Sequence, residues 1–207
     1  MKLKVCGMTE FEQLQTLQEL EVDFAGLIFY EGSKRFVGNK LNGQKSAIRN
    51  LKIKKVGVFV NATLNDIETA INDYSLSYIQ LHGDESPEFC KEATKVIPII
   101  KAIGISEETD LANELEKFED ACDYILFDTG SKQYGGTGKK FNWEVLQSTK
   151  ISKPFFLSGG IGLQDIEEVK AFHHPMLFAI DVNSKFESSP GIKDLRQVKE
   201  FMKNLNR

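Results

Sequence analysis

The stretch YILFDTGSKQYGGTGKKFNW, from Tyr124 to Trp143, decides how the rest of the chain is interpreted. Its first four residues are apolar or aromatic and run directly into Asp128, and a glycine-rich segment follows. A short, continuous apolar run is typical of a strand that is buried on both faces of a parallel sheet. Parallel α/β folds carry their chemistry at the carboxyl ends of such strands. Asp128 is therefore a candidate functional residue, although a carboxylate at this place can equally cap a turn.

Other short apolar runs in the chain predict further buried strands. They span residues 3–6, 26–30, 56–60, 77–81, 98–102, 155–158 and 176–182. Segments with apolar residues at helical spacing lie between most of them, at residues 11–20, 43–51, 64–74, 87–95, 107–118, 163–172 and 192–205. Alternating strands and helices predict a parallel sheet with helical crossovers.

Eight strand–helix units fit one closed (β/α)8 barrel, the TIM-barrel fold, in which residues 1–207 form a single domain. The short repeat leaves no room for a second domain, and 207 residues is at the short end for such a barrel. An open doubly wound sheet is the alternative fold, but it usually has about five or six strands.

The composition limits the possible partners and locations. A net charge of −4 provides no basic surface, so we expect no nucleic-acid partner. No apolar run approaches the roughly 20 residues that cross a bilayer, and the first residues lack a signal-peptide pattern, so we expect no membrane association. Three cysteines without metal-ligand spacing indicate reduced thiols and therefore a cytoplasmic protein. The composition does not distinguish a monomer from a homodimer.

In a (β/α)8 barrel, the active site is built at the carboxyl ends of the strands. Residues that can bind or react follow most of the predicted strands. They are Cys6, Arg35, Asn61, His82, Lys101, Asp128, Gly159, Gly160, Asp181, Asn183 and Ser184. We therefore expect a thiol, a carboxylate, an imidazole and a guanidinium around a common mouth.

The glycine- and serine-bearing loops late in the chain favour phosphate binding. Backbone N–H groups at Gly159 and Gly160 can approach an anion closely, and residues 188–191 could open a helical turn. Both segments can also be ordinary connecting turns. Arg35 could hold a carboxylate or phosphate with its planar fork, unless it is a solvent-facing loop arginine.

Cys6 and Asp128 are the candidates for proton transfer, since a thiolate can remove a proton and a carboxylic acid can donate one. A structural role is the alternative for Cys6, because free cysteine is among the most buried residue types. The sequence contains no catalytic-triad order, no glycosidase-like carboxylate pair and no metal-ligand cluster. These residues predict isomerisation or carbon–carbon chemistry on a phosphorylated small molecule, with no metal or other cofactor.

A set of motifs extends over nearly the whole chain. The motifs are KVCGMT (4–9), GLIFYEGSKRFV (26–37), VGVFVN (56–61), IQLHGDES (79–86), FDTGSKQYGGTGKKFNW (127–143), FFLSGGI (155–161) and IDVNSKFESSPGIKD (180–194). Together, and in this order, they resemble the motifs of the phosphoribosylanthranilate isomerase family. The KVCG, QLHGDE, GGTG-x-x-F-x-W and ESSPG-x-KD segments carry the resemblance, whereas GGI alone would be weak.

The resemblance implies an Amadori rearrangement in tryptophan biosynthesis, in which N-(5-phosphoribosyl)anthranilate becomes 1-(2-carboxyphenylamino)-1-deoxyribulose 5-phosphate. It also implies that Cys6 is the general base and Asp128 the general acid. Arg35 would bind the anthranilate carboxylate. The other substrate-binding positions that it implies are His82, the loop residues Gly136 and Gly138, Asp181, and a phosphate site at Gly159, Gly160, Asn183 and Ser184.

Two residues depart from the family pattern, namely Lys34, where proline is frequent, and Lys185, where glycine is common. Lys185 adds a cation near the expected phosphate turn. Two other functions fit the residues without the resemblance. A phosphate-binding barrel lyase would use Lys101 as its strand-end lysine, and a non-catalytic barrel would bind phosphosugars without converting them.

Overall fold

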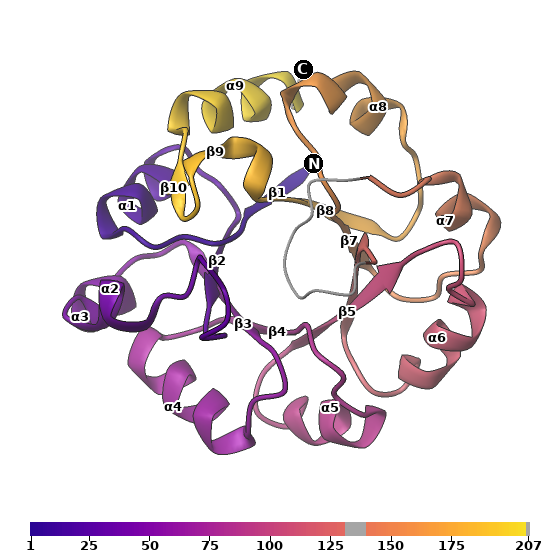
Figure 1. Cartoon of the computed structure of the whole chain (residues 1–207), viewed down its shortest axis with the longest axis horizontal. Coiled ribbons are helices and arrows are strands. Elements are labelled where there is room, and N and C mark those ends of the chain that lie inside the picture. The colour runs from indigo at the N-terminus through magenta and orange to yellow at the C-terminus, as the bar shows by residue number, and fades with distance from the viewer. Residues whose placement is uncertain (131–139, 206–207) are drawn as a thin grey trace.

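The predicted strands close into a cylinder of parallel strands, and helices surround it (Figure 1). The computed structural model describes residues 1–130 and 140–205. The strands of the cylinder are β1 (Lys2–Val5), β2 (Phe24–Ile28), β3 (Lys54–Phe59), β4 (Tyr78–Leu81), β5 (Ile99–Ile105), β6 (Tyr124–Thr129), β7 (Phe155–Leu157) and β8 (Leu177–Val182). Pairing runs in order from β1 to β8 and closes between β8 and β1, which confirms the predicted TIM barrel.

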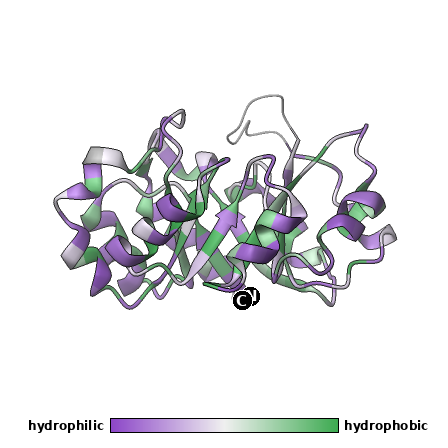
Figure 2. Cartoon of the chain, turned by 90° about the horizontal axis from the view of Figure 1, so that it is seen from below, coloured by the Kyte–Doolittle hydropathy of each residue, from purple (hydrophilic) through white to green (hydrophobic). Residues whose placement is uncertain are grey.

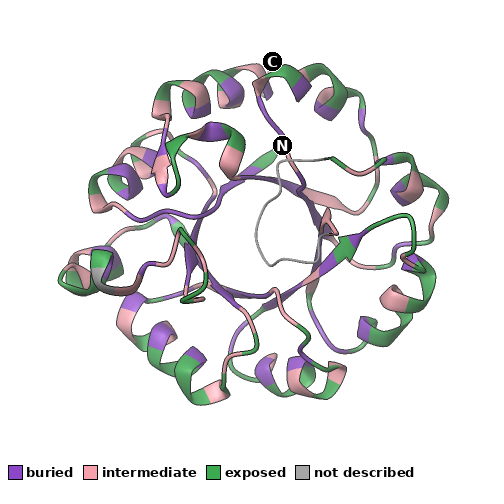
Figure 3. Cartoon of the chain, viewed as in Figure 1, coloured by how far each residue is buried: buried purple, intermediate pink, exposed green. Residues whose placement is uncertain are grey.

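The helices form the outer layer. They are α1 (Phe11–Glu19), α2 (Gly38–Asn42), α3 (Lys45–Arg49), α4 (Leu64–Tyr74), α5 (Pro87–Ala93), α6 (Leu111–Phe118), α7 (Glu144–Ser148), α8 (Ile166–Ala171) and α9 (Leu195–Leu205), with short 3-10 helices η1 (Leu163–Asp165) and η2 (Ser184–Phe186). In Figure 3 the strand ring is largely buried and the helices present exposed residues outward. Figure 2 shows hydrophobic strands at the centre and mixed hydropathy on the helices, as amphipathic packing requires. Within the described ranges, no helix is both long and apolar enough to span a bilayer.

Two segments differ from the sequence prediction. Residues 43–51 were expected to form a helix, and α3 lies there, but the chain also forms the short helix α2 directly before it, which was not predicted. Residues 188–191 do not open a helical turn, because they lie in a hairpin of β9 (Glu187–Ser189) and β10 (Ile192–Lys193), and α9 therefore begins at Leu195.

Contacts with α1 and the loop before it explain the hairpin. The Thr9 hydroxyl donates to the carbonyl oxygen of Gly191 at 2.8 Å. The Gln13 carboxamide donates to the backbone oxygen of Lys193 and accepts from its N–H, each at 2.9 Å. Gly191 has a φ of 89°, a turn conformation that glycine adopts without steric cost. The segment therefore takes the shape that its distant partners require.

A layer of aromatic rings fills the amino-terminal end of the barrel. Phe24, Tyr78, Tyr124 and Phe178 come from the even-numbered strands and contact each other in a closed circuit, with ring centroids 5.5, 5.8, 4.8 and 6.0 Å apart. Phe156 of β7 packs against three of these rings. Barrel interiors are filled in this way by layers of side chains from alternate strands. The aromatic layer supports the barrel at the end opposite the predicted site.

We expect that removing one ring of this layer destabilises the protein without altering its chemistry. Phe24 is completely buried, so Phe24→Ala should lower the free energy of unfolding by about 3–5 kcal/mol in a urea titration. Val96→Ala is a suitable control, because Val96 is 51% exposed and its truncation should change stability by less than about 0.5 kcal/mol. Equal stabilities of the two variants would show that the aromatic layer does not support the barrel.

Candidate active site

A pocket opens at the carboxyl ends of the strands, where the sequence predicts the site. Its wall is formed by residues at or just beyond the ends of most strands. They are Cys6, Ile28, Tyr30, Ser33, Val58, Val60, Gln80, His82, Asp128, Ser158, Gly160, Ile161, Asp181, Asn183 and Ser184. Cys6, beyond β1, and Asp128, in β6, thus lie on the same face of the barrel and line the same pocket.

The structure brings together most of the residues that the sequence predicts for the site. The predicted residues in the pocket wall are Cys6, His82, Asp128, Gly160, Asp181, Asn183 and Ser184. Gly159 precedes Gly160 in the same loop, and the two have φ values of 96° and 67°, which favour glycine. The predicted loop positions Gly136 and Gly138 lie outside the described residues.

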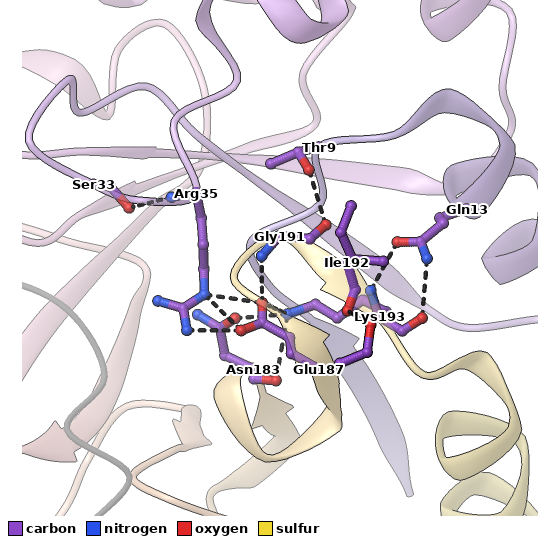
Figure 4. A network of polar contacts seen from close by, with 10 residues as sticks. Thr9, Gln13, Ser33, Arg35, Asn183, Glu187, Gly191, Ile192 and Lys193 are labelled. Carbon is purple, nitrogen blue, oxygen red and sulfur yellow. Dashed lines mark hydrogen bonds and ion pairs between the residues drawn. The ribbon is translucent and has the colours of Figure 1, made fainter.

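The Arg35 guanidinium has a carboxylate partner within the chain (Figure 4). Arg35 Nε and Nη2 donate to the Glu187 carboxylate at 2.9 and 2.7 Å, respectively. Glu187 also accepts a hydrogen bond from Lys193 Nζ at 2.6 Å, and Lys193 donates to Asn183 Oδ1 at 2.7 Å. Burial disfavours ionised Glu187, but Arg35 and Lys193 outweigh it and hold the pKa of Glu187 below its usual value. Two cations and one anion leave a net positive charge beside Asn183, in the pocket wall.

Lys101, the strand-end lysine that a lyase would need, is not placed for chemistry in this pocket. Its ammonium pairs with the buried Glu85 carboxylate at 2.8 Å and lies 5.5 Å from the ring centroid of Phe118 in α6. It therefore faces the helix layer rather than the barrel interior, where its neighbour Ile100 belongs to the core. The prediction that Lys101 joins the strand-end site is wrong, because successive side chains of a strand point to opposite faces.

The Cys6 sulfur occupies a space that Gly26 of β2 leaves open. A Cβ atom at position 26 would lie 2.7 Å from Cys6 Sγ, so any larger residue there would displace the sulfur. Burial raises the pKa of the Cys6 thiol, and the neighbouring ammonium of Lys4 acts in the opposite direction. The net pKa is raised, so the thiol is the resting form at neutral pH.

Burial also shifts the pKa of the Asp128 carboxyl group upward. The pKa rises from 3.8 to about 6, and the hydrogen bond from the Thr129 N–H to Oδ1, at 2.8 Å, limits the rise. The nearby Asp181 carboxylate raises the pKa further. Asp128 therefore keeps a proton near neutral pH much more often than an ordinary aspartate does.

A chain of buried polar groups links the predicted Asp181 to Lys4, Gln80 and Ser158, which the sequence pattern did not indicate for the site. Lys4 Nζ donates to Gln80 Oε1 at 2.8 Å and to Asp181 Oδ1 at 2.9 Å. Ser158 Oγ donates to the second oxygen of Asp181 at 3.2 Å. Strand alternation could have predicted the inward position of Lys4, because side chains two residues apart, such as Lys4 and Cys6, lie on the same face.

The same chain continues to Asp128 through His82. Gln80 Nε2 lies 2.7 Å from His82 Nδ1, and His82 Nε2 lies 3.6 Å from Asp128 Oδ2. Burial, followed by the charges of Lys4 and Lys101, lowers the pKa of His82 to about 4, so its imidazole is neutral at pH 7. The pair with Asp128 is therefore a contact between a neutral ring and a carboxyl group.

These features define a (β/α)8 barrel whose strand-end pocket presents a thiol and a carboxyl group to a small molecule. Within the described residues, no group of three or more His, Cys, Asp or Glu side chains is placed to hold a metal ion. General acid–base chemistry is the chemistry that the pocket residues themselves can supply.

Comparison with known proteins identifies the family. The model of the N-(5'-phosphoribosyl)anthranilate (PRA) isomerase family matches residues 3–204. The N-(5'-phosphoribosyl)anthranilate isomerase of Parabacteroides distasonis is 42% identical over 207 residues, which cover 99% of this chain and 93% of the relative. The chain belongs to the phosphoribosylanthranilate isomerase family, and its activity is the conversion of N-(5'-phosphoribosyl)anthranilate to 1-(2-carboxyphenylamino)-1-deoxyribulose 5-phosphate in tryptophan biosynthesis.

Two solved structures are similar over their whole length. Monomers generated from the dimeric phosphoribosylanthranilate isomerase of Thermotoga maritima are 30% identical, with a TM-score of 0.82, and the match covers 99% of this chain and 98% of theirs. A phosphoribosylanthranilate isomerase in complex with reduced 1-(o-carboxyphenylamino)-1-deoxyribulose 5-phosphate is 30% identical, with a TM-score of 0.81 and the same coverage of 99% and 98%.

The raised pKa of Asp128 predicts that its carboxyl group destabilises the folded protein at neutral pH. The folded protein binds the proton more tightly than the unfolded chain, so this group lowers the free energy of unfolding as the pH rises from about 4 to about 6. Asp128→Asn cannot ionise and should raise that free energy by on the order of 2–3 kcal/mol at pH 8, but by little at pH 4. Urea unfolding at the two pH values measures this difference, and an equal effect at both would contradict the shifted pKa.

Proposed function

We propose that the chain performs this isomerisation in the pocket described above, with Asp128 as the general acid and Cys6 as the general base. One observation carries the proposal. A carboxyl group whose pKa is close to neutrality and a thiol line the same pocket, although they come from β6 and the end of β1. A single sugar between them can exchange protons with both.

The first step is ring opening. Protonated Asp128 donates its proton to the furanose ring oxygen, the bond between this oxygen and C1 breaks, and a Schiff base forms between C1 and the anthranilate nitrogen. The raised pKa of Asp128 provides the protonated form in about one tenth of the molecules at pH 7. The carboxylate formed in this step lies 3.6 Å from His82 Nε2.

The second step removes the proton at C2. The Cys6 thiolate takes this proton, the electron pair of the C–H bond forms the enolamine, and tautomerisation gives the ketone. One proton is given and one is taken, so the reaction needs no net proton. The two steps leave a thiol and a carboxylate, which is the resting form that the pKa order of the two groups favours. The reactive form, with protonated Asp128 and the Cys6 thiolate, differs from this resting form only in the position of one proton.

The charged ends of the substrate fit two parts of the pocket wall. We place the phosphate at Gly160 and at the turn of Asn183 and Ser184, because these residues line the pocket and the glycine lets backbone N–H groups approach an anion. We place the anthranilate carboxylate near Arg35, because the cluster of Arg35, Glu187 and Lys193 has a net positive charge.

The remaining parts of the proposal concern the state of the protein. Residues 1–207 act as one catalytic domain in the cytoplasm, as a monomer or a homodimer. The relative bound to a reduced, phosphorylated deoxyribulose supports a phosphorylated substrate, and the dimeric Thermotoga maritima relative supports the homodimer. Light scattering on the purified chain distinguishes the two states.

Loss of either reacting group should reduce turnover strongly. We expect Cys6→Ala and Asp128→Asn each to lower kcat by about 10²–10⁴-fold, the usual contribution of a general base or acid. The fluorescence of the anthranilate group follows the reaction. Cys90→Ala is the matched control, because Cys90 is buried in α5 outside the barrel and should leave kcat unchanged. Near-normal rates in both variants would exclude the proposed mechanism.

Loss of the Arg35 guanidinium should weaken substrate binding more than chemistry. Arg35→Met should raise KM by about 10–100-fold with a smaller change in kcat, because a charge-assisted contact with the substrate carboxylate is lost. Lys34→Met removes a neighbouring exposed cation and serves as the control. A large fall in kcat at unchanged KM would assign Arg35 to the chemical step instead.

A further inference from the structure

We propose that Lys4 is a positioning residue that prepares both reacting groups of the pocket, Cys6 through its neighbouring positive charge and Asp128 through Gln80 and His82. The proposal deepens the function above and rests on the roles assigned there to Cys6 and Asp128. It concerns a side chain that does not line the pocket and lies beneath it.

Lys4 is a lysine with no exposed surface inside the barrel. Its ammonium donates to Gln80 Oε1 at 2.8 Å and to Asp181 Oδ1 at 2.9 Å, and Cys6 follows two residues later on the same face of the chain. Burial disfavours the charged form, but Asp181 and Cys6 outweigh it and raise the pKa of Lys4 above its usual value. Lys4 is therefore a fixed positive charge at neutral pH.

The first effect of this charge is on Cys6. Several charged or titratable groups surround the sulfur. They are Lys4, Asp181, Lys193, Arg35, His82 and Asp128. Among the charges that favour the thiolate, Lys4 has the largest effect. A positive charge near a thiol stabilises the thiolate, which is the form that removes the C2 proton.

The second effect is on the direction of the hydrogen bonds that lead to Asp128. The ammonium of Lys4 can only donate, so the Gln80 atom that faces it must be the oxygen. The Gln80 nitrogen then faces His82 and donates to Nδ1, 2.7 Å away. Since His82 is neutral, its proton lies on Nε2, which points toward Asp128 Oδ2 at 3.6 Å. An N–H dipole thus faces the carboxylate that forms when Asp128 gives up its proton.

A purely structural role of Lys4 makes a different prediction. If Lys4 only neutralised Asp181, its loss would destabilise the fold, because one buried charge would remain without its partner. It would leave the reactivity of the Cys6 thiol unchanged. The pH dependence of that reactivity therefore separates the two roles.

Alkylation of Cys6 by iodoacetamide, measured by mass spectrometry across a pH series, reports its thiolate fraction without substrate. Burial, the leading cause in both cases, raises the pKa of Cys90 to about 11 and that of Cys122 to about 12, so these thiols contribute little near neutrality. Lys4→Met should slow the alkylation of Cys6 at pH 7 by roughly tenfold or more. Gln80→Met places methionine between Lys4 and His82, where it breaks the hydrogen bonds that lead to Asp128 but keeps the charge of Lys4. This variant should leave the alkylation rate unchanged while lowering kcat.

Two further variants keep the test decisive if Lys4→Met does not fold. Lys4→Gln removes the charge but keeps an N–H donor for Asp181, and it should also slow alkylation. Asp181→Asn should act in the opposite direction and speed alkylation, because the Asp181 carboxylate raises the pKa of Cys6. A structural role does not predict opposite signs for the two partners of one ion pair.

The proposal is wrong if the folded variants at Lys4 and Asp181 alkylate at the wild-type rate. This outcome is distinct from failure of the proposed mechanism, which is tested by the activity of Cys6→Ala. A fully active Cys6→Ala combined with slowed alkylation in Lys4→Met would keep the electrostatic effect of Lys4 and remove its role in the reaction.

Discussion

A buried ion pair between Lys4 and Asp181 joins the two strands at which the barrel closes. These residues are direct partners in the pairing of β1 with β8, and their charged atoms are 2.9 Å apart inside the cylinder. Their side chains are 0% and 6% exposed. If one partner were lost, water could not solvate the remaining buried charge. A slip of one residue between the two strands would turn one of the charges toward the helix layer. The pair therefore favours one register at the seam and orients the polar groups beneath the pocket.

The two ends of the barrel interior differ in function, since one end stabilises the fold and the other contains the reactive groups. Its amino-terminal end is filled by aromatic rings, four of them from alternate strands, and hydrophobic packing between the rings supplies stability there. Its carboxyl end contains groups that are unfavourable for stability, such as a buried carboxyl with a pKa of about 6. The rigid layer below allows these groups to be held in place, as a precise site requires.

The sequence predicted the architecture well, because short apolar runs and helical spacing are local signals. The hairpin around Pro190 was missed, since serine, proline and glycine fit both a helical start and a turn, and distant contacts from Thr9 and Gln13 decide between them. The Arg35–Glu187 pair joins residues 152 positions apart, which no local pattern indicates. The outward position of Lys101, in contrast, follows from strand alternation and could have been predicted.

The seam between β1 and β8 also has a consequence for biosynthesis. Its two charged partners are 177 positions apart, so β1, the first of the barrel strands to be made, must wait for β8, the last of them. Until then the edge of β1 has no partner on one side, and Lys4 must stay hydrated because its counter-ion has not been made. Closure of the cylinder and burial of this charge therefore occur together, and only after β8 has been made.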